Sequence, residues 1–414
     1  MANTFKFGNG NWAVKDGYAL AYNDENNNFK PLPFDFTRAS TATRVNKQGL
    51  VEVVPSGKPR IDFLDNTSGH LLLEPSRTNR STHSENFSNS VWSRTNSTVS
   101  TNQTVAPDGT VTADRLIEST ATGSHDIRQN EGGLSSGTQY TYSVFVKEYE
   151  EGSYRNVNFY VGGINSTGTF SFSTGTFTAH SFDSAKAVNY GNGWYRLEIT
   201  DTTVSTTFNT IILTQNGTTT NYTGDGSSGF YLWGSQFEQG SYATSYIPTE
   251  GSSVTRSKDD VDTNYGDINS LSGEVSVYFN LLPQVSAASN TNKCLMFGFN
   301  SSSDTQSYAN LRFSTTNWAS RIQGTTGNNF NDLGINKTTE IKAVMVLTQS
   351  GYSLYANGST AVASGSYGGT APTINSVAYV QILNDSDDRG IYRIKELKVY
   401  NTALTATEAI NLTS

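Results

Sequence analysis

The sequence predicts an all-β protein with two antiparallel β-sandwiches that follow an extended N-terminal segment. Two features of the 414 residues favour this class: aromatic residues reach 12%, and charged residues only 15%. The third is the pattern, in which short aromatic and β-branched runs end at clusters of Gly, Asn and Ser. Such runs pack well on pleated sheets, and those clusters form tight connections. The length exceeds what one core supports, so we expect more than one domain.

The first expected region, residues 1–80, begins with a segment that has no core of its own. Its first 35 residues carry several large aromatic side chains, namely Phe5, Phe7, Trp12, Tyr18, Tyr22 and Phe29. Burying such a side chain is worth roughly 1.5–3 kcal/mol, so leaving several exposed is unfavourable. We expect this segment to dock on the next domain, a sister subunit or another protein.

Residues 36–80 are predicted to form hairpins, with a tight turn at Asn46-Lys47-Gln48-Gly49. Five charged residues gather here: Arg38, Arg60, Asp62, Glu74 and Arg77. They form either a binding or catalytic cluster, or Arg–carboxylate pairs that fasten irregular loops. No base or nucleophile accompanies them, which favours the fastening role.

Residues 81–262 are predicted to form the first sandwich and a linker. Strand-like runs occur at 140–146, 157–161, 194–199, 210–213 and 230–233. Antiparallel strands in this number are typical of a jelly roll. The polar stretch 251–270 is the linker candidate.

Residues 263–414 are predicted to form the second sandwich. Its strand-like runs lie at 274–279, 295–299, 341–346, 352–356 and 391–400. After the last run, Thr405 and Glu408 have the spacing of a capping box, which predicts a short terminal helix.

Two signatures stand in order along the chain. The first runs Phe36-Thr37-Arg38-Ala39-Ser40-Thr41-Ala42-Thr43 and closes at Leu73-Glu74-Pro75-Ser76-Arg77-Thr78-Asn79. The second is Trp233-Gly234-Ser235-Gln236-Phe237-Glu238-Gln239-Gly240, followed by Ser245-Tyr246-Ile247-Pro248-Thr249. Together they resemble a family of bacteriophage virion proteins found among head-fibre, tail and tail-fibre components. The resemblance implies a structural or adhesive role in a virus particle, a trimeric assembly and other virion proteins as partners.

Two further resemblances concern the sandwiches. The layout of strands over residues 81–250 resembles jelly-roll carbohydrate-binding modules. The run from Ile394 to Thr405 resembles the closing strand of concanavalin-like or laminin-G-like lectin domains. Both resemblances imply that the chain binds a glycan on the host surface.

The charge balance and the lack of targeting signals restrict the partners. The net charge is −8, and no Lys/Arg cluster of the kind that follows phosphates is present, so we expect no nucleic acid. No apolar run reaches the length of a membrane span, and the residues after Met1 lack a signal-peptide core. We expect assembly in a host cytoplasm, without membrane insertion, and a place in the virion.

Candidate catalytic and metal-binding residues are few. Carboxylates that could serve a polysaccharide hydrolase in the first sandwich are Glu118, Asp126, Glu131, Glu198 and Glu238. Each is better explained as a solvated strand or loop residue. Ca²⁺ is the one cofactor candidate: Asp385, Asp387 and Asp388 lie in an acidic loop before Gly390, although the following residues alternate as a strand rather than a helix.

The candidate glycan site is the polar stretch around Trp318. There the indole ring would stack on a sugar while Arg321 or Asn317 binds its hydroxyl groups. Simple packing of Trp318 at a sheet edge is the alternative. Trp194 and Trp233 lie inside apolar strands and are expected in the core.

The sequence thus favours a non-enzymatic virion protein that contributes to adhesion on host glycans. One alternative is a capsid-decoration or tail subunit that binds no ligand. A third is a phage polysaccharide depolymerase, whose carboxylate site a sequence would not reveal.

Overall fold

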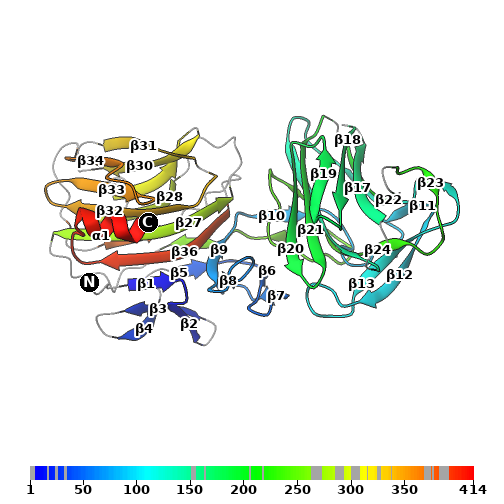
Figure 1. Ribbon diagram of the computed structural model, residues 1–414. Coiled ribbons are helices and arrows are strands. Elements are labelled where there is room, and N and C mark those ends of the chain that lie inside the picture. The colour runs from blue at the N-terminus through cyan, green and yellow to red at the C-terminus, as the bar shows by residue number, and fades with distance from the viewer. Residues whose placement is uncertain are drawn as a thin grey trace. The chain divides into compact units, whose positions relative to one another are not determined.

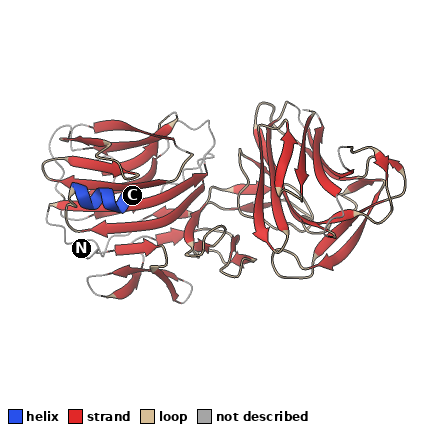
Figure 2. Cartoon of the chain, in the orientation of Figure 1, coloured by secondary structure: helices blue, strands red, loops and turns tan. Residues whose placement is uncertain are grey.

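The computed structural model describes residues 5–15, 18–23, 27–31, 35–150, 155–162, 165–204, 207–216, 219–262, 273–284, 293–299, 308–314, 316–323, 328–336, 338–367, 374, 377–381 and 391–414. Within these ranges the regular structure is antiparallel strands and a single helix, α1 (Ala406–Thr413) (Figures 1 and 2). The all-β class and its antiparallel sandwiches are therefore confirmed. No helix among these residues is long and apolar enough to span a membrane.

The chain forms two compact units, each assembled from separated segments. Unit 1 contains residues 1–41, 54–76 and 257–414, and unit 2 contains residues 42–53 and 77–256. The sequence-based division into 1–80, 81–262 and 263–414 treated the chain as consecutive pieces. It could not show that most of the first piece and all of the last piece belong to one unit.

Unit 1 contains a large sheet and a five-stranded sheet. The path through the large sheet is β2 (Trp12–Lys15), β3 (Tyr18–Asn23), β1 (Phe5–Gly8), β36 (Ile391–Tyr400), β27 (Glu274–Gln284), β32 (Ile341–Thr348), β33 (Tyr352–Ala356) and β34 (Ala363–Gly365). Beside this path lie β4 (Asn28–Pro31), β8 (Arg60–Asp62) and β9 (His70–Leu73). The second sheet has the order β31 (Asn328–Asn336), β30 (Asn317–Gln323), β29 (Tyr308–Phe313), β28 (Lys293–Phe299) and β35 (Val377–Gln381).

These two sheets of unit 1 share one hydrophobic core. Alternate residues of β27 and β32, such as Val277 and Ala343, enter this core together with Leu311 and Ile322 of the smaller sheet. Period-two alternation along each strand produces this inner face, as the sequence pattern predicts.

The N-terminal segment docks on unit 1 itself. β1 pairs with β36 over four residues, from Phe5 opposite Val399 to Gly8 opposite Glu396. The side chain of Phe7 is 1% exposed in the core. Trp12 packs against Phe63, and its indole N–H donates to the carbonyl of Ser68. These aromatic side chains therefore give no reason to expect a second chain as their partner.

Unit 2 is a sandwich of two six-stranded sheets. The first has the order β11 (Ser93–Thr95), β15 (Asp126–Gly132), β22 (Thr207–Asn216), β17 (Arg155–Gly162), β18 (Ser166–Ser171) and β19 (Thr176–His180). The second has the order β12 (Ser97–Thr104), β13 (Ala113–Glu118), β24 (Gly229–Gln239), β16 (Gln139–Glu148), β21 (Trp194–Thr202) and β20 (Ser184–Gly191).

The second sheet of unit 2 is apolar on both faces over part of its area. Its inner face presents Val144 and Val146 to a core shared with Val157 and Phe159 of the first sheet. Its outer face carries a second cluster around Phe145, Trp194 and Trp233, which Val51, Ala106 and Tyr246 help to form. The expectation that Trp194 and Trp233 lie in the core is confirmed, since each is at most 2% exposed.

Four short strand pairs complete the described structure. They are β5 (Asp35–Thr37) with β26 (Asp260–Asp262), β6 (Ala42–Val45) with β7 (Val51–Val54), β10 (Arg77–Asn79) with β25 (Val254–Arg256), and β14 (Thr122–Gly123) with β23 (Tyr222–Thr223). The turn at Asn46–Gly49 is confirmed: the Gly49 N–H donates to the Asn46 carbonyl at 2.9 Å. The chain passes from unit 2 to unit 1 between residues 256 and 257, inside the expected linker 251–270, and the described part of that stretch also forms β25 and β26 and contains the buried Asp259.

Candidate functional site

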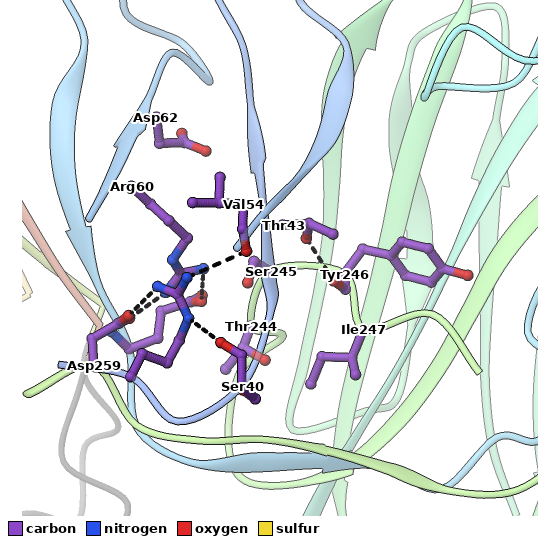
Figure 3. A network of polar contacts seen from close by, with 12 residues as sticks. Ser40, Thr43, Val54, Arg60, Asp62, Thr244, Ser245, Tyr246, Ile247 and Asp259 are labelled. Carbon is purple, nitrogen blue, oxygen red and sulfur yellow. Dashed lines mark hydrogen bonds and ion pairs between the residues drawn. The ribbon is translucent and has the colours of Figure 1, made fainter. Parts of the chain in front are cut away.

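Three of the five charged residues singled out in the sequence meet in unit 1. Arg38, Arg60 and Glu74 surround Asp259, a residue that the sequence placed in a linker. Figure 3 shows the Arg60 side chain directed at Asp259. We call these four residues the arginine cluster. Their side chains are at most 1% exposed.

Asp259 is the centre of the arginine cluster. Its Oδ1 accepts from Arg38 Nη1 at 2.9 Å, and its Oδ2 accepts from Arg60 Nη2 and from the backbone N–H of Glu74. Arg60 Nη1 donates to Glu74 Oε2 at 2.6 Å. Burial alone would lower the pKa of Arg60, but the charges of Asp259 and Glu74 raise it above its usual value. The two arginine cations and the two carboxylates therefore neutralise each other in a site that is buried from water.

The arginine cluster fastens loops rather than presenting a reactive group. Arg38 also donates from Nε to the carbonyl of Ser40 and from Nη2 to that of Pro55. The cluster thus ties segments near residues 40, 55, 74 and 259 to one another. The fastening interpretation of these residues is confirmed, and bidentate arginine geometry explains why arginine is used.

Arg77 and Asp62 belong to other sites. Arg77 lies in unit 2, with its Nε 3.8 Å from Glu238 Oε2. Asp62 Oδ1 lies 3.4 Å from Nε2 of His70 in unit 1. Burial lowers the pKa of His70 to about 3, helped by the charges of Arg393 and Lys395. The Asp62 carboxylate opposes this shift, but desolvation of a side chain only 1% exposed is the larger effect.

The two sequence signatures meet in a buried network of unit 2. Asn79 donates from Nδ2 to the carbonyls of Ser235 and Ile247, at 3.0 and 2.8 Å. Its Oδ1 accepts from the backbone N–H groups of Ser81 and Phe237, both at 3.0 Å. One asparagine therefore joins the end of the first signature to both parts of the second. We call this network the signature clasp.

Gln236 and Glu238 extend the signature clasp. Gln236 accepts from the Ile247 N–H at 2.7 Å and donates to Glu238 at 2.6 Å. Glu238 also accepts from the backbone N–H and the hydroxyl of Thr244, at 2.9 and 2.8 Å. Position 240 favours glycine, because its φ is +144° and a Cβ there would lie 2.9 Å from Arg77 Nη2. These signature residues serve the fold of unit 2.

The expected glycan site around Trp318 is not assembled. Trp318 is fully buried in the core of unit 1, and its indole N–H donates to the Thr339 carbonyl at 3.1 Å. It therefore has no exposed face to stack on a sugar, which corrects the sequence-based expectation in favour of packing. Asn317, the first residue of β30, donates to Asp332 of β31 at 2.9 Å. Arg321 is partly exposed on β30, opposite Phe330 of β31.

The expected Ca²⁺ ligands Asp385, Asp387 and Asp388 lie outside the described residues. Among the residues that are described, no group of three or more His, Cys, Asp or Glu side chains could hold a metal ion.

Glu118 of the first sandwich is held by partners. It accepts from Arg155 through both carboxylate oxygens at 2.7 Å, and from the Tyr222 hydroxyl at 2.5 Å. Burial would raise the pKa of Glu118, but the hydrogen bonds from Arg155 and Tyr222 outweigh it and lower the pKa. Glu118 therefore stays an ionised structural group.

Glu131, another of the five candidate carboxylates, has a raised pKa. Burial raises its pKa to about 7, and the nearby charge of Arg80 only partly offsets this effect. Gln129 lies two residues earlier, on the same face of β15, and accepts from the Ser81 hydroxyl at 2.7 Å. A carboxyl that is partly protonated near neutral pH could serve as a general acid.

A partly exposed tyrosine site that the sequence did not reveal lies on the second sheet of unit 2. Tyr231 of β24 lies directly opposite Arg115 of β13 on one side and directly opposite Lys147 of β16 on the other. Each follows or precedes a residue of the inner core, so by alternation all three point to the outer face. Tyr149 continues the same side of β16. We call Arg115, Lys147, Tyr149 and Tyr231 the tyrosine face.

The tyrosine face is pre-arranged by contacts among its members. The Arg115 guanidinium lies over the Tyr149 ring, 3.1 Å from its centroid, and donates to the Ser227 carbonyl. The Tyr149 and Tyr231 rings meet edge to face, with centroids 5.7 Å apart. Tyr231 rests against the outer apolar cluster of the sheet, which fixes its orientation. Alternation shows which residues share a face, but only the strand register brings these four together.

Comparison with known proteins yields weak structural similarity only. No family model and no curated protein matches the chain. The CBM40 of a Ruminococcus gnavus IT-sialidase, solved with α2,3 sialyllactose bound, matches with a TM-score of 0.29 and 13% identity, over 35% of this chain and 85% of that chain. The receptor-binding domain of a botulinum neurotoxin C/D mosaic serotype matches with a TM-score of 0.29 and 13% identity, over 38% of this chain and 40% of that chain. At this level of similarity no ligand or activity transfers to the present chain.

Proposed function

We propose that this chain is a non-enzymatic glycan-binding component of a bacteriophage particle, and that the tyrosine face is its binding site. The observation that carries the glycan part is the pair of partly exposed tyrosine rings, Tyr149 and Tyr231, on a rigid sheet face beside two cations. The virion part rests on the sequence resemblance, whose signature residues build the clasp of unit 2.

The chemistry of the tyrosine face suits a saccharide. A sugar ring has an apolar face of C–H groups and a rim of hydroxyls, and a tyrosine offers an apolar ring with a polar tip. Arg115 and Lys147 add hydrogen-bond donors at the sides of Tyr231. Because the sheet and the Arg115–Tyr149 contact hold these groups in place, binding would order few side chains.

Several weak sites on one particle would act together. A shallow site of this kind binds weakly by itself, while linked copies gain affinity through effective concentration, typically by 10² or more. A homotrimer, expected from the resemblance, would supply three such sites and other virion proteins would anchor them. Light scattering of the purified chain tests the trimer.

The binding test is affinity electrophoresis of the intact chain in gels that contain dextran, xylan or sodium polygalacturonate. The wild type should be retarded in at least one gel, and Tyr149→Ala should lose most of that retardation at unchanged thermal stability. Thr178→Ala, at an exposed position of the opposite sheet, is the control and should be retarded like the wild type. Retardation in none of the gels would overturn the proposed site and favour a decoration or tail subunit without a ligand.

Glu131 gives the depolymerase alternative a specific residue. If the chain cleaves polysaccharide through this partly protonated carboxyl, incubation with the same three polymers should release reducing ends, and Glu131→Gln should stop the release. We expect no release by either protein. Release by the wild type alone would replace the adhesion proposal with an enzymatic one.

A further inference from the structure

We propose that the saccharide bound by the tyrosine face is anionic, with a carboxylate or phosphate group that contacts Arg115 and Lys147. This inference rests on the proposed function of the same site and adds the chemical class of the ligand.

The register of three strands carries the argument. Arg115 lies opposite Tyr231 on one side, and Lys147 lies opposite Tyr231 on the other. Adjacent strands are about 4.8 Å apart, so the two cationic residues flank the ring with backbones separated by roughly 10 Å. A single sugar unit over Tyr231 would lie between them, with its acidic substituent beside Arg115 or extended past the ring toward Lys147, whose stem lies along Gly193.

Neither cation has an ion-pair partner among the described residues, although the chain as a whole is acidic at −8. The ion pairs of the described structure involve other residues, such as Arg38, Arg60 and Arg155. The Arg115 Nε is buried without a hydrogen-bond partner. The Lys147 ammonium group makes no hydrogen bond or ion pair within those same ranges.

The acidic groups near the tyrosine face do not cancel its charge. Glu150 is exposed just beyond the end of β16, where its negative charge influences the Tyr231 hydroxyl. Glu148 is adjacent to Lys147, and alternation directs it to the other side of the sheet. Two cations beside one partly exposed ring, against the one carboxylate of Glu150 that acts on it among the described residues, match a negatively charged ligand. Such contacts to a carboxylate or phosphate are stronger than contacts to a hydroxyl.

The experiment compares two polymers with the same sugar ring and different charge. The wild type is run in gels with sodium polygalacturonate and with its fully methyl-esterified form, whose carboxylates are neutral. We expect retardation to be about tenfold stronger on the charged polymer, and to weaken as salt rises from 20 to 300 mM, because exposed charge contacts are screened.

Lys147→Gln separates charge from stacking. It removes one cation and leaves both tyrosines, so retardation on polygalacturonate should fall about three- to tenfold. Lys186→Gln makes the same charge change at an exposed position of β20 in the same sheet, and should behave like the wild type.

The outcomes are distinguishable. Equal retardation on both polymers, with no effect of Lys147→Gln, would overturn the anionic ligand and leave the glycan site standing. A loss that is equally large for Lys186→Gln would show that net charge alone steers the polymer, which also overturns the inference. Retardation on neither polymer, nor on colominic acid as a second acidic probe, would overturn the anionic ligand, and the glycan site itself would fall only if dextran and xylan also failed to retard the chain.

Discussion

A single carboxylate, Asp259, contacts two buried arginines. Removing it would take away the carboxylate that Arg38 and Arg60 share, and Glu74 would still pair with Arg60. Breaking a buried pair by deleting one partner usually costs about 3–5 kcal/mol, because the other charge stays without compensation.

We therefore expect Asp259→Ala to lower the stability of unit 1 by about 3–5 kcal/mol in urea denaturation. The neighbouring Asp260 offers a matched control, since its pair with Lys258 is exposed. Asp260→Ala should change stability by less than about 1 kcal/mol. Similar losses for both variants would contradict the buried arrangement.

His70 makes the stability of unit 1 sensitive to acid. Its pKa is about 3 in the folded protein and about 6.5 when unfolded, so the unfolded chain binds more protons between these values. The contribution of neutral His70 to the free energy of unfolding is complete above about pH 6.5. It is lost as the pH falls toward 3, with a slope near 1.4 kcal/mol per pH unit.

The check is urea denaturation at pH 7, 5.5 and 4.5. We expect His70→Gln to lose less stability than the wild type over this range. His180→Gln, at an exposed position of unit 2, should lose as much as the wild type. Parallel curves for His70→Gln and the wild type would show that His70 accepts a proton in the folded state, contrary to this account.

At the scale of elements, α1 begins at a capping box that the sequence predicts correctly. Thr405 accepts from the Glu408 N–H, and Glu408 accepts from the Thr405 N–H in return. The helix buries Ala409 against an apolar cluster with Val344 and Tyr355. We expect Thr405→Ala to destabilise unit 1 by about 1 kcal/mol.

The exposed Thr407 serves as the control for this cap. Thr407→Ala replaces a weak helix former by a strong one, so it should be neutral or slightly stabilising. Both variants can be compared by guanidinium denaturation, and a loss at Thr407 as large as that at Thr405 would argue against a specific role of the cap.

Local elements could be predicted because their signals lie within a few residues. The hairpin turn at Asn46–Gly49, the run that became β16 and the cap at Thr405 each depend on neighbours in sequence. The candidate glycan site around Trp318 failed for the opposite reason. Whether the ring of Trp318 points inward depends on the pairing of β30 and on the core, and the partner of Arg60 lies 199 positions away.

At the scale of the whole molecule, each unit has its own hydrophobic core. We expect two unfolding transitions in differential scanning calorimetry, and substitutions that act on one transition only. Asp259→Ala should lower the transition of unit 1. Asn79→Ala breaks the four hydrogen bonds at the centre of the signature clasp and should lower that of unit 2, by about 3 kcal/mol or more.

Thr78→Ala is the matched control for Asn79, because its hydroxyl bonds Thr255 at the surface. It should leave both transitions within about 0.5 kcal/mol of the wild type. If Asp259→Ala and Asn79→Ala instead shift one common transition, the two units unfold as one cooperative block.

The pairing of β36 with β1, β9 and β27 sets an order of events on the ribosome. The first strands of unit 1 leave the exit tunnel early, yet their central partner begins only at Ile391. At 5–20 residues per second this wait is on the order of half a minute. Unit 2 is fully synthesised by Arg256, so it can close while Phe7, Leu71 and Leu73 still lack their neighbours. During that interval the nascent chain exposes apolar strand edges that chaperones would recognise, and truncation before residue 391 would leave them exposed permanently.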